Sequence, residues 1–237
     1  MIKIYGKNCV YAAIHSKAKI ELVYLLNDIN KKDNNIIKLL EDKGYNYKLV
    51  SKEVMNKEFG DSHQGYGALR SDYNILGEDY LSNLPKEGGR VLILDGIQDP
   101  HNLGAIIRSV DAFSYDLIIL PKNRSVSINK TVAHVSTGAI EYINIMYVNS
   151  LNSVVEKLKK LNYWICGTDA SGDVLANSID KSLNLAVIIG SEGFGMSKTL
   201  VKASDYLITI PMTGHVNSLN ASVSCGIVLS LLMANKK

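Results

Sequence analysis

The sequence predicts an α/β protein made of two units, a small one at the N-terminus and a larger one with a mainly parallel sheet. Short apolar segments typical of strands alternate with helical patterns along the 237 residues. Between the two units, residues 71–89 contain Pro85, Gly88 and Gly89 and no strong apolar period, as linkers do. We therefore predict one unit at residues 1–72, a linker at 73–89 and a second unit at 90–237.

The first unit shows short helices and strands in alternation. Ser51 is a typical N-cap residue and predicts that a helix begins directly after it, whereas Gly44 predicts the end of an earlier helix. Helical patterns cover residues 8–15 and 34–43, and strand patterns cover 21–26, 47–50 and 66–69.

The second unit contains strongly apolar strand patterns joined by helices. The helix after the first strand has one apolar stripe, and Arg108 points almost opposite to it, so this arginine does not serve the core. The last helix, residues 219–235, is apolar nearly all round, which predicts that the sheet and a second subunit cover it. The strand patterns are 90–94, 116–120, 163–166, 185–189 and 206–210, and the stripe is Leu103, Ile106, Ile107, Val110 and Phe113.

Composition excludes several classes of protein. A hydrophobic share of 46% with 21% charged residues is that of a globular chain. The apolar run at 227–234 is far shorter than the roughly 20 residues that cross a bilayer, and the N-terminus lacks a signal peptide's apolar core. Cys9, Cys166 and Cys225 are far apart, and the histidines lack ligand spacing. We expect a cytoplasmic protein with no membrane contact and no metal.

The positive charge is concentrated in the first third of the chain. Residues 1–70 carry twelve Lys and Arg against eight Asp and Glu, a net charge of +4, whereas the whole chain has +3. Lysine-rich helix faces are usually only solvated, so an anionic partner is a hypothesis at this point.

Three polar segments follow strands, at residues 94–109, 187–200 and 208–226. Ligands of open parallel sheets bind at the carboxyl ends of strands, so these segments predict the site. Simpler interpretations remain open: Asp99 or Asn102 could cap a helix, and Ser218 could do the same. The glycine-rich segment fits neither phosphate-binding motif, and Glu192 within it would repel phosphate. Hydrolase, NTPase and dehydrogenase motifs are absent from the sequence.

Taken in order, DPHNLGAIIR, GSEGFGMS and IPMTGHVNSLNAS resemble the three motifs of the SpoU, or TrmH, family of RNA 2′-O-ribose methyltransferases. HQGYGAL at 63–69 further resembles the substrate-binding domain of the ribosomal-RNA branch. Phe194 departs from the family pattern, because relatives often have a polar residue there.

The resemblance implies a C-terminal α/β trefoil-knot methyltransferase domain, an L30e-like N-terminal substrate-binding domain, a homodimer and S-adenosylmethionine as methyl donor. Carried onto this sequence, the donor-binding residues are Thr168, Gly190, Gly195, Ile210 and Leu219. The active-site residues are Asn102, Arg108, Glu192, Ser218 and Asn220, and candidate phosphate contacts in the N-terminal unit are Lys7, Lys17, Lys19 and Arg70.

The reaction needs alignment of a ribose 2′-oxygen with the donor's methyl group, and loss of the hydroxyl proton. A guanidinium is a poor base, so we interpret Arg108 as a grip on the adjacent phosphate that also stabilises negative charge on the oxygen. The proton would be lost to solvent or to an Arg108 perturbed by its setting. Asn102 would hold Arg108 or the ribose. Glu192 would orient Asn102 or Arg108, or it would simply cap the next helix. The favoured target is a guanosine of large-subunit ribosomal RNA. The alternatives are a transfer-RNA ribose methylase and a non-catalytic RNA-binding or ribosome-assembly factor.

Overall fold

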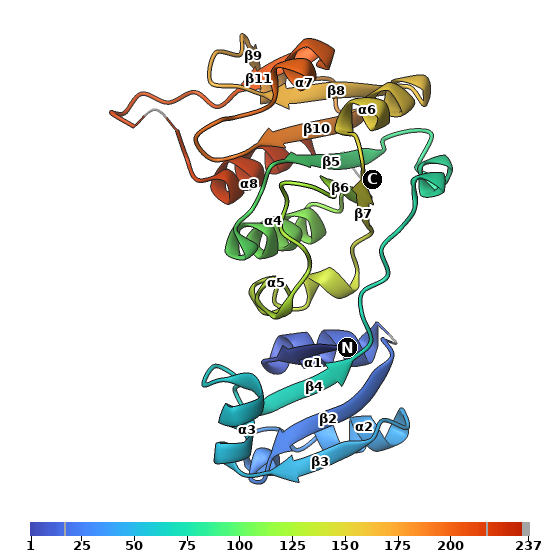
Figure 1. Ribbon diagram of the computed structural model, residues 1–237, viewed down its shortest axis with the longest axis vertical. Helices are drawn as coiled ribbons and strands as arrows, with labels where there is room; N and C mark the ends of the chain where they lie inside the picture. Colours follow the sequence, from blue (N-terminus) through green and yellow to red (C-terminus); the bar gives the residue numbers. More distant parts are fainter. Residues whose placement is uncertain (17, 217, 234–237) are drawn as a thin grey trace. The chain divides into compact units, whose positions relative to one another are not determined.

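The chain forms two compact units (Figure 1). The computed structural model describes residues 1–16, 18–216 and 218–233. The N-terminal unit comprises Met1–Tyr73 together with Ile128–Tyr142, and the C-terminal unit comprises Asn74–Ser127 and the chain from Ile143 onward. Residues 128–142 therefore belong by their contacts to the N-terminal unit, although they follow the predicted linker in the sequence.

A four-stranded mixed sheet forms the centre of the N-terminal unit, with strand order β1-β4-β2-β3. Strands β1 and β2 both run antiparallel to β4, and β3 runs parallel to β2. The helix and strand patterns of this unit are confirmed to within two residues, and Ser51 caps α3 as expected. The elements are β1 (Ile2–Tyr5), α1 (Lys7–His15), β2 (Ile20–Leu26), α2 (Ile36–Asp42), β3 (Tyr47–Val50), α3 (Lys52–Phe59) and β4 (Tyr66–Arg70), with α5 (Lys130–Val135) contributed by the later segment.

Polar and aromatic contacts hold the later segment within the N-terminal unit. The His134 ring stacks on Tyr5 with ring centroids 4.2 Å apart. Glu141 forms a buried ion pair with Arg70, whose guanidinium also lies 3.6 Å from the centre of the Tyr73 ring. The sequence could not reveal this association, because these partners lie tens of residues apart along the chain.

The C-terminal unit contains a seven-stranded sheet in which every strand pair is parallel, as predicted. The strand order is β7-β6-β5-β10-β8-β11-β9. The edge strands β7 and β9 were not predicted. The strands are β5 (Arg90–Asp95), β6 (Leu117–Pro121), β7 (Ile145–Val148), β8 (Tyr163–Thr168), β9 (Val174–Leu175), β10 (Asn184–Gly190) and β11 (Tyr206–Thr209).

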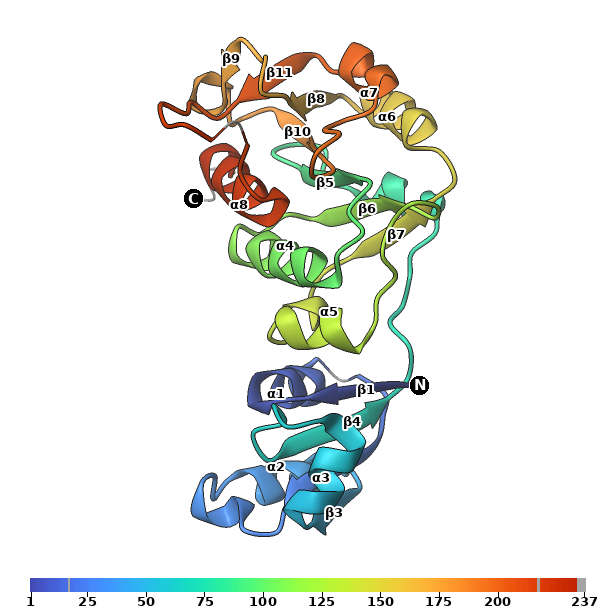
Figure 2. The ribbon, with the colours of Figure 1, turned by 60° about the vertical axis from the view of Figure 1, so that its left-hand side comes forward.

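Helices cover both faces of this sheet (Figure 2). Helices α4 (Pro100–Ala112) and α8 (Ala221–Leu232) contact each other on one face, and α6 (Leu151–Lys160) and α7 (Lys198–Ala203) lie on the other. The predicted linker contains a short 3-10 helix, Glu78–Asn83, and its Leu81 joins the core on the side of α6. The linker is thus partly built into the C-terminal unit.

A buried arginine fixes the C-terminal end of α8. Arg90 is 1% exposed, and its guanidinium donates hydrogen bonds to backbone carbonyls. Nε donates to Leu232 O at 2.8 Å, and Nη1 donates to Leu183 O at 2.7 Å. Because the last carbonyls of a helix carry partial negative charge, a cation at this position stabilises α8.

Within the described residues, no helix combines the length and apolar character needed to cross a membrane.

Candidate functional site

The three polar segments meet at one edge of the C-terminal sheet. In the parallel pairing of β5 with β10, Asp95 lies opposite Gly190, so the loops after these strands begin side by side. The loop after β11 leads into α8, which contacts α4. Parallel strands bring their carboxyl ends together, which is why residues about 120 positions apart in sequence become neighbours here.

The first segment supplies Asn102 from the first turn of α4. Asp99 caps this helix by accepting a hydrogen bond from the His101 N–H at 2.9 Å, and Pro100 follows at the first helical position. Asn102 is therefore not the cap. Its side chain is 7% exposed and points to the other two segments.

Glu192 joins the three segments through a single carboxylate oxygen. Its Oε1 accepts hydrogen bonds from Asn102 Nδ2 at 3.0 Å, from Asn220 Nδ2 at 2.6 Å and from the Ala221 N–H at 3.1 Å. Asn220 Nδ2 also donates to Asn102 Oδ1 at 3.0 Å. Glu192 therefore orients Asn102, as one of the predicted options stated.

In the third segment, Asn220 and not Ser218 caps α8. Asn220 Oδ1 accepts hydrogen bonds from the N–H groups of Ser222 and Val223, at 2.9 and 3.3 Å. The interpretation of Ser218 as the cap is therefore wrong, and Ser218 lies in the preceding loop. The carboxylate of Glu192 lies at the N-terminus of α8, where the helix dipole favours negative charge. Asn217 lies outside the described residues.

The second segment forms a closed loop between β10 and α7. Ser191 and Gly195 exchange two backbone hydrogen bonds of 3.0 Å each, and Gly193 and Gly195 have φ angles of +84° and +65°. Gly190 permits this close approach, because a Cβ atom there would lie 2.2 Å from the carbonyl carbon of Gly195. The loop is anchored at its far end by the Ser197 N–H, which donates to Asp95 Oδ2 at 2.8 Å.

A first cavity, which we call the donor cavity, has a volume of about 720 Å³ and lies between this loop and the segment before α8. All the predicted donor-binding residues line it, as do three of the predicted active-site residues. Asp169 lines it as well, and hydrogen bonds from Ser171 hold the pKa of that carboxyl below its ordinary value. The predicted residues in its wall are Thr168, Gly190, Gly195, Ile210 and Leu219, with Glu192, Ser218 and Asn220.

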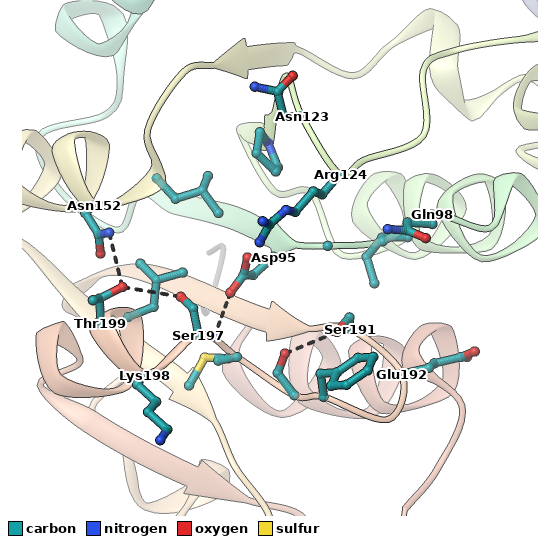
Figure 3. Close-up of a pocket in the computed structure, with 18 of the residues that line it drawn as sticks. Asp95, Gln98, Asn123, Arg124, Asn152, Ser191, Glu192, Ser197, Lys198 and Thr199 are labelled. Atoms are coloured by element: carbon teal, nitrogen blue, oxygen red, sulfur yellow. Dashed lines mark hydrogen bonds between the residues drawn. The ribbon is translucent and has the colours of Figure 1, made fainter.

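A second cavity, which we call the polar cavity, has a volume of about 1020 Å³ and lies at the ends of β5, β6, β7 and β10. Figure 3 shows side chains from the loops after these strands arranged around it. Ser191, Glu192, Phe194 and Gly195 line both cavities, so the closed loop is a shared wall. The predicted segments at 94–109 and 187–200 supply most of its lining, Gln98 among them. The residues that follow β6 and β7 were not predicted to belong to a site, and they include Asn123, Arg124, Asn149 and Asn152.

Arg108 is exposed on α4 and lines neither cavity. No hydrogen bond or ion pair joins its side chain to another residue in the part of the chain that the structure describes. The expectation that Asn102 or Glu192 holds Arg108 is therefore not met within this chain. Asn102 and Glu192 bond to each other and to Asn220 instead.

The predicted phosphate contacts of the N-terminal unit have different environments. Lys7 is exposed and pairs with Asp33 at 3.1 Å, and Lys19 is exposed. Arg70 is only 6% exposed and is paired with Glu141, so its expected role as a phosphate contact is corrected to a structural one. Lys17 lies outside the described residues.

The cysteines and the acidic residues suggest no further chemistry at the site. Burial raises the pKa of Cys166 to about 12 and also raises the pKa of Cys225, so neither thiol is a nucleophile at neutral pH. Within residues 1–16, 18–216 and 218–233, no cluster of three or more His, Cys, Asp and Glu side chains could hold a metal ion.

Comparison with known protein families gives two matches that together cover most of the chain. Residues 89–230 match the family described as "SpoU rRNA Methylase family", and residues 3–75 match the one described as "RNA 2'-O ribose methyltransferase substrate binding". A relative from Staphylococcus saprophyticus, named a TrmH family tRNA/rRNA methyltransferase, is 40% identical over 232 residues, which cover 96% of this chain and 93% of the relative. A relative of the same name from Staphylococcus aureus is 38% identical over 230 residues, 95% of this chain and 93% of the relative.

Solved structures share the fold. The SpoU methyltransferase AviRb from Streptomyces viridochromogenes, in complex with the cofactor AdoMet, has a TM-score of 0.81 at 19% identity and covers 98% of this chain and 88% of its own. The AdoMet-bound rRNA methyltransferase from Sinorhizobium meliloti has a TM-score of 0.81 at 24% identity, with 98% and 86% covered.

Proposed function

Because the chain belongs to the SpoU family of RNA 2′-O-ribose methyltransferases, we propose that it transfers a methyl group from S-adenosylmethionine to a ribose 2′-oxygen in ribosomal RNA. A guanosine of the large subunit is the favoured target. One observation carries the proposal: Asn102, Glu192 and Asn220 bond to one another beside a cavity lined by the donor-binding residues expected from the motifs.

The donor cavity fits S-adenosylmethionine in size and chemistry. Its volume of about 720 Å³ lies in the range of small-molecule sites, roughly 300–1,000 Å³. Ile208, Ile210 and Leu219 offer apolar contacts for a purine ring, and the Asp169 and Glu192 carboxylates suit the donor's positive charges. When bound, the donor supplies an electrophilic methyl group on a positively charged sulfur.

The network around Glu192 positions the site. One carboxylate oxygen fixes two amide side chains and the first N–H of α8, so the three loops keep a single relative arrangement. Asn102 faces the polar cavity and Asn220 faces the donor cavity. We assign Asn102 to the ribose and Ser218 and Asn220 to the donor side, with alignment of the two reactants as their main contribution.

Arg108 binds the phosphate next to the reacting ribose and stabilises negative charge on the 2′-oxygen, while the proton passes to solvent. Its exposure and its lack of an ion pair within the described residues support this role, because an arginine that waits for a phosphate needs an uncommitted guanidinium.

A homodimer would complete the site. Helix α8 leaves Val223 49% exposed and Leu231 37% exposed, which is unusual for a helix so apolar and favours coverage by a second subunit. Arg108 lies on α4, the helix that α8 contacts, so the same interface would bring it close to a site. We further propose that the segment before α8 threads the loop after β10 as a trefoil knot. A crystal structure with that segment outside the loop would contradict the knot.

The N-terminal unit, which we propose to be L30e-like, docks on the RNA. Its match to a substrate-binding family and its basic composition support this role, and its affinity for RNA should fall steeply with salt. We propose residues 1–72 as the docking domain and residues 90–237 as the catalytic domain, except that residues 128–142 belong by their contacts to the N-terminal unit. We propose the cytoplasm as the location. The three described cysteines are free thiols, which suits a reducing compartment.

Substitution of Arg108 tests the reaction. Arg108→Ala should lower methyl transfer to RNA by about 100-fold or more, because it removes the group that stabilises the developing charge. Tritiated methyl incorporation measures transfer, and calorimetry with S-adenosylmethionine should show unchanged donor binding. Lys160→Ala, an exposed charge at the end of α6, is the matched control. Normal incorporation by Arg108→Ala would contradict the assigned role.

A map of ribose methylation identifies the substrate. Mass spectrometry of RNA from cells that lack the protein should show the loss of one modified nucleotide in large-subunit ribosomal RNA. The names of two relatives include both transfer RNA and ribosomal RNA, so both substrates must be mapped. Loss of a modified nucleotide from transfer RNA alone would favour the transfer-RNA alternative.

A further inference from the structure

An aromatic side chain stands fully exposed between the two cavities of the C-terminal unit. Phe194 is 93% exposed and lines both the donor cavity and the polar cavity. Among the residues that the structure describes, every other large apolar side chain is at most 73% exposed. An aromatic ring with almost no protein contact in the wall of a binding site indicates that a ligand or a partner covers it.

The loop fixes the backbone on both sides of this ring. The reciprocal hydrogen bonds between Ser191 and Gly195 close the loop just around Phe194. On the C-terminal side, Met196 is 7% exposed, and the Ser197 N–H is bonded to Asp95. An aromatic side chain has only two rotatable bonds to fix when a planar ligand stacks on it, so a ring carried by a closed loop suits recognition by stacking.

The polar cavity beside the ring is lined by groups that suit a nucleobase. Gln98, Asn123 and Asn149 are exposed carboxamides that have no hydrogen-bond partner within the described residues, and each offers both a donor and an acceptor to a base edge. The carboxylates of Asp95 and Asp99 are already used by the Ser197 and His101 N–H groups.

We propose that the base of the target nucleotide leaves its stack, enters the polar cavity and stacks on Phe194. The inference rests on the proposed function and names its substrate class: a nucleotide in a loop, bulge or single strand, with its base accessible. The ribose then lies at Asn102 and Glu192, which border the same cavity, and the donor lies on the opposite side of the shared loop. Arg124, also in this cavity, is placed to meet a flanking phosphate.

Substitutions of Phe194 test the need for an aromatic ring. Phe194→Ala and Phe194→Leu should weaken binding of a fluorescein-labelled single-stranded RNA by about 5- to 100-fold, whereas Phe194→Tyr should bind as the unchanged protein does. Binding of a blunt RNA duplex of the same sequence should change less than two-fold in every variant. Leu161→Ala, an exposed apolar residue at the end of α6, is the matched control. Unchanged binding by Phe194→Leu would overturn the proposal.

Two further measurements test whether the methyl donor or a second copy of the chain, and not a base, covers Phe194. Calorimetry with S-adenosylmethionine should give the same dissociation constant for Phe194→Ala, and light scattering should give the same oligomeric state. Weaker donor binding would assign the ring to the donor, and loss of an oligomer would assign it to a second copy of the chain; either result overturns the proposal. RNA binding does not require turnover, so a protein that binds through Phe194 without methylating would contradict the proposed function alone.

Discussion

Two glutamates, one in each unit, each collect several hydrogen bonds but lie in different surroundings. In the N-terminal unit, Glu141 has a side chain that is only 3% exposed and accepts from Arg70, Tyr73 and Ser16. In the C-terminal unit, Glu192 is exposed at the border of two cavities and accepts from amides alone.

The difference shows how a carboxylate can serve structure or chemistry. Burial raises the pKa of Glu141 in spite of the nearby guanidinium, so this group depends on Arg70 to remain charged. Glu192 keeps its contact with water and has no cationic partner among the described residues. It orients the loops while its charge remains available to a positively charged ligand.

Loss of the buried cation should have the largest effect on stability. Arg70→Met leaves Glu141 buried without its partner and should lower the free energy of unfolding of the N-terminal unit by about 3–5 kcal/mol. Hydrogen exchange of the amides in β1 and β4 measures this change. Arg70→Met combined with Glu141→Met should recover most of the loss. A single variant as stable as the unchanged protein would show that the pair does not hold the segment 128–142 in place.

Removal of the exposed carboxylate should affect catalysis far more than stability. Glu192→Ala releases Asn102 and Asn220 from their shared acceptor, and misplacement of this kind costs about 100-fold in rate. We expect that loss in methyl incorporation, together with a small fall in the urea unfolding midpoint of the C-terminal unit, because Asn102 and the first N–H of α8 lose an acceptor. Glu192→Gln, which keeps an acceptor, should lose less. If Glu192→Ala retained full activity, the positioning role would be wrong.

The N-terminal unit should show a smaller, acid-dependent loss of stability. Burial alone would raise the pKa of Asp33, but hydrogen bonds from Tyr11, Tyr66 and Lys7 hold it at about 2, below the ordinary 3.8. A depressed carboxyl pKa stabilises the fold above pH 3.8, and that contribution disappears as the pH falls toward 2.

Unfolding of the N-terminal unit in urea as a function of pH measures this contribution. The free energy of unfolding should decline through the acid range in the unchanged protein, and Asp33→Asn should flatten the part of the decline that this carboxyl causes. The same slope in both proteins would contradict the assignment.

The sequence located the elements better than the contacts between them. Apolar runs such as 185–189 identified buried strands, because a strand covered on both faces cannot tolerate polar residues. The short strand β7 and the association of residues 128–142 with the N-terminal unit escaped prediction, since each depends on partners distant in sequence.

The sequence predicted which residues form the site better than it predicted which of them bond to one another. The motifs selected Glu192, Asn102 and Asn220 as active-site residues, and the structure shows that they bond to one another. The same motifs suggested a contact with Arg108 that the chain does not make by itself. They gave no indication of Asn123 and Asn149, which line the polar cavity from the loops after β6 and β7.

By itself the sequence determined the fold class, the family and the loops that carry the polar residues, because apolar period and motif order are local properties. Only the tertiary structure decided that Asn220 rather than Ser218 caps α8, that Arg70 is buried with Glu141, and that Phe194 stands between two cavities. Each of these depends on which segments pack together in the folded chain, because that packing determines which side chains are buried and which groups form hydrogen bonds.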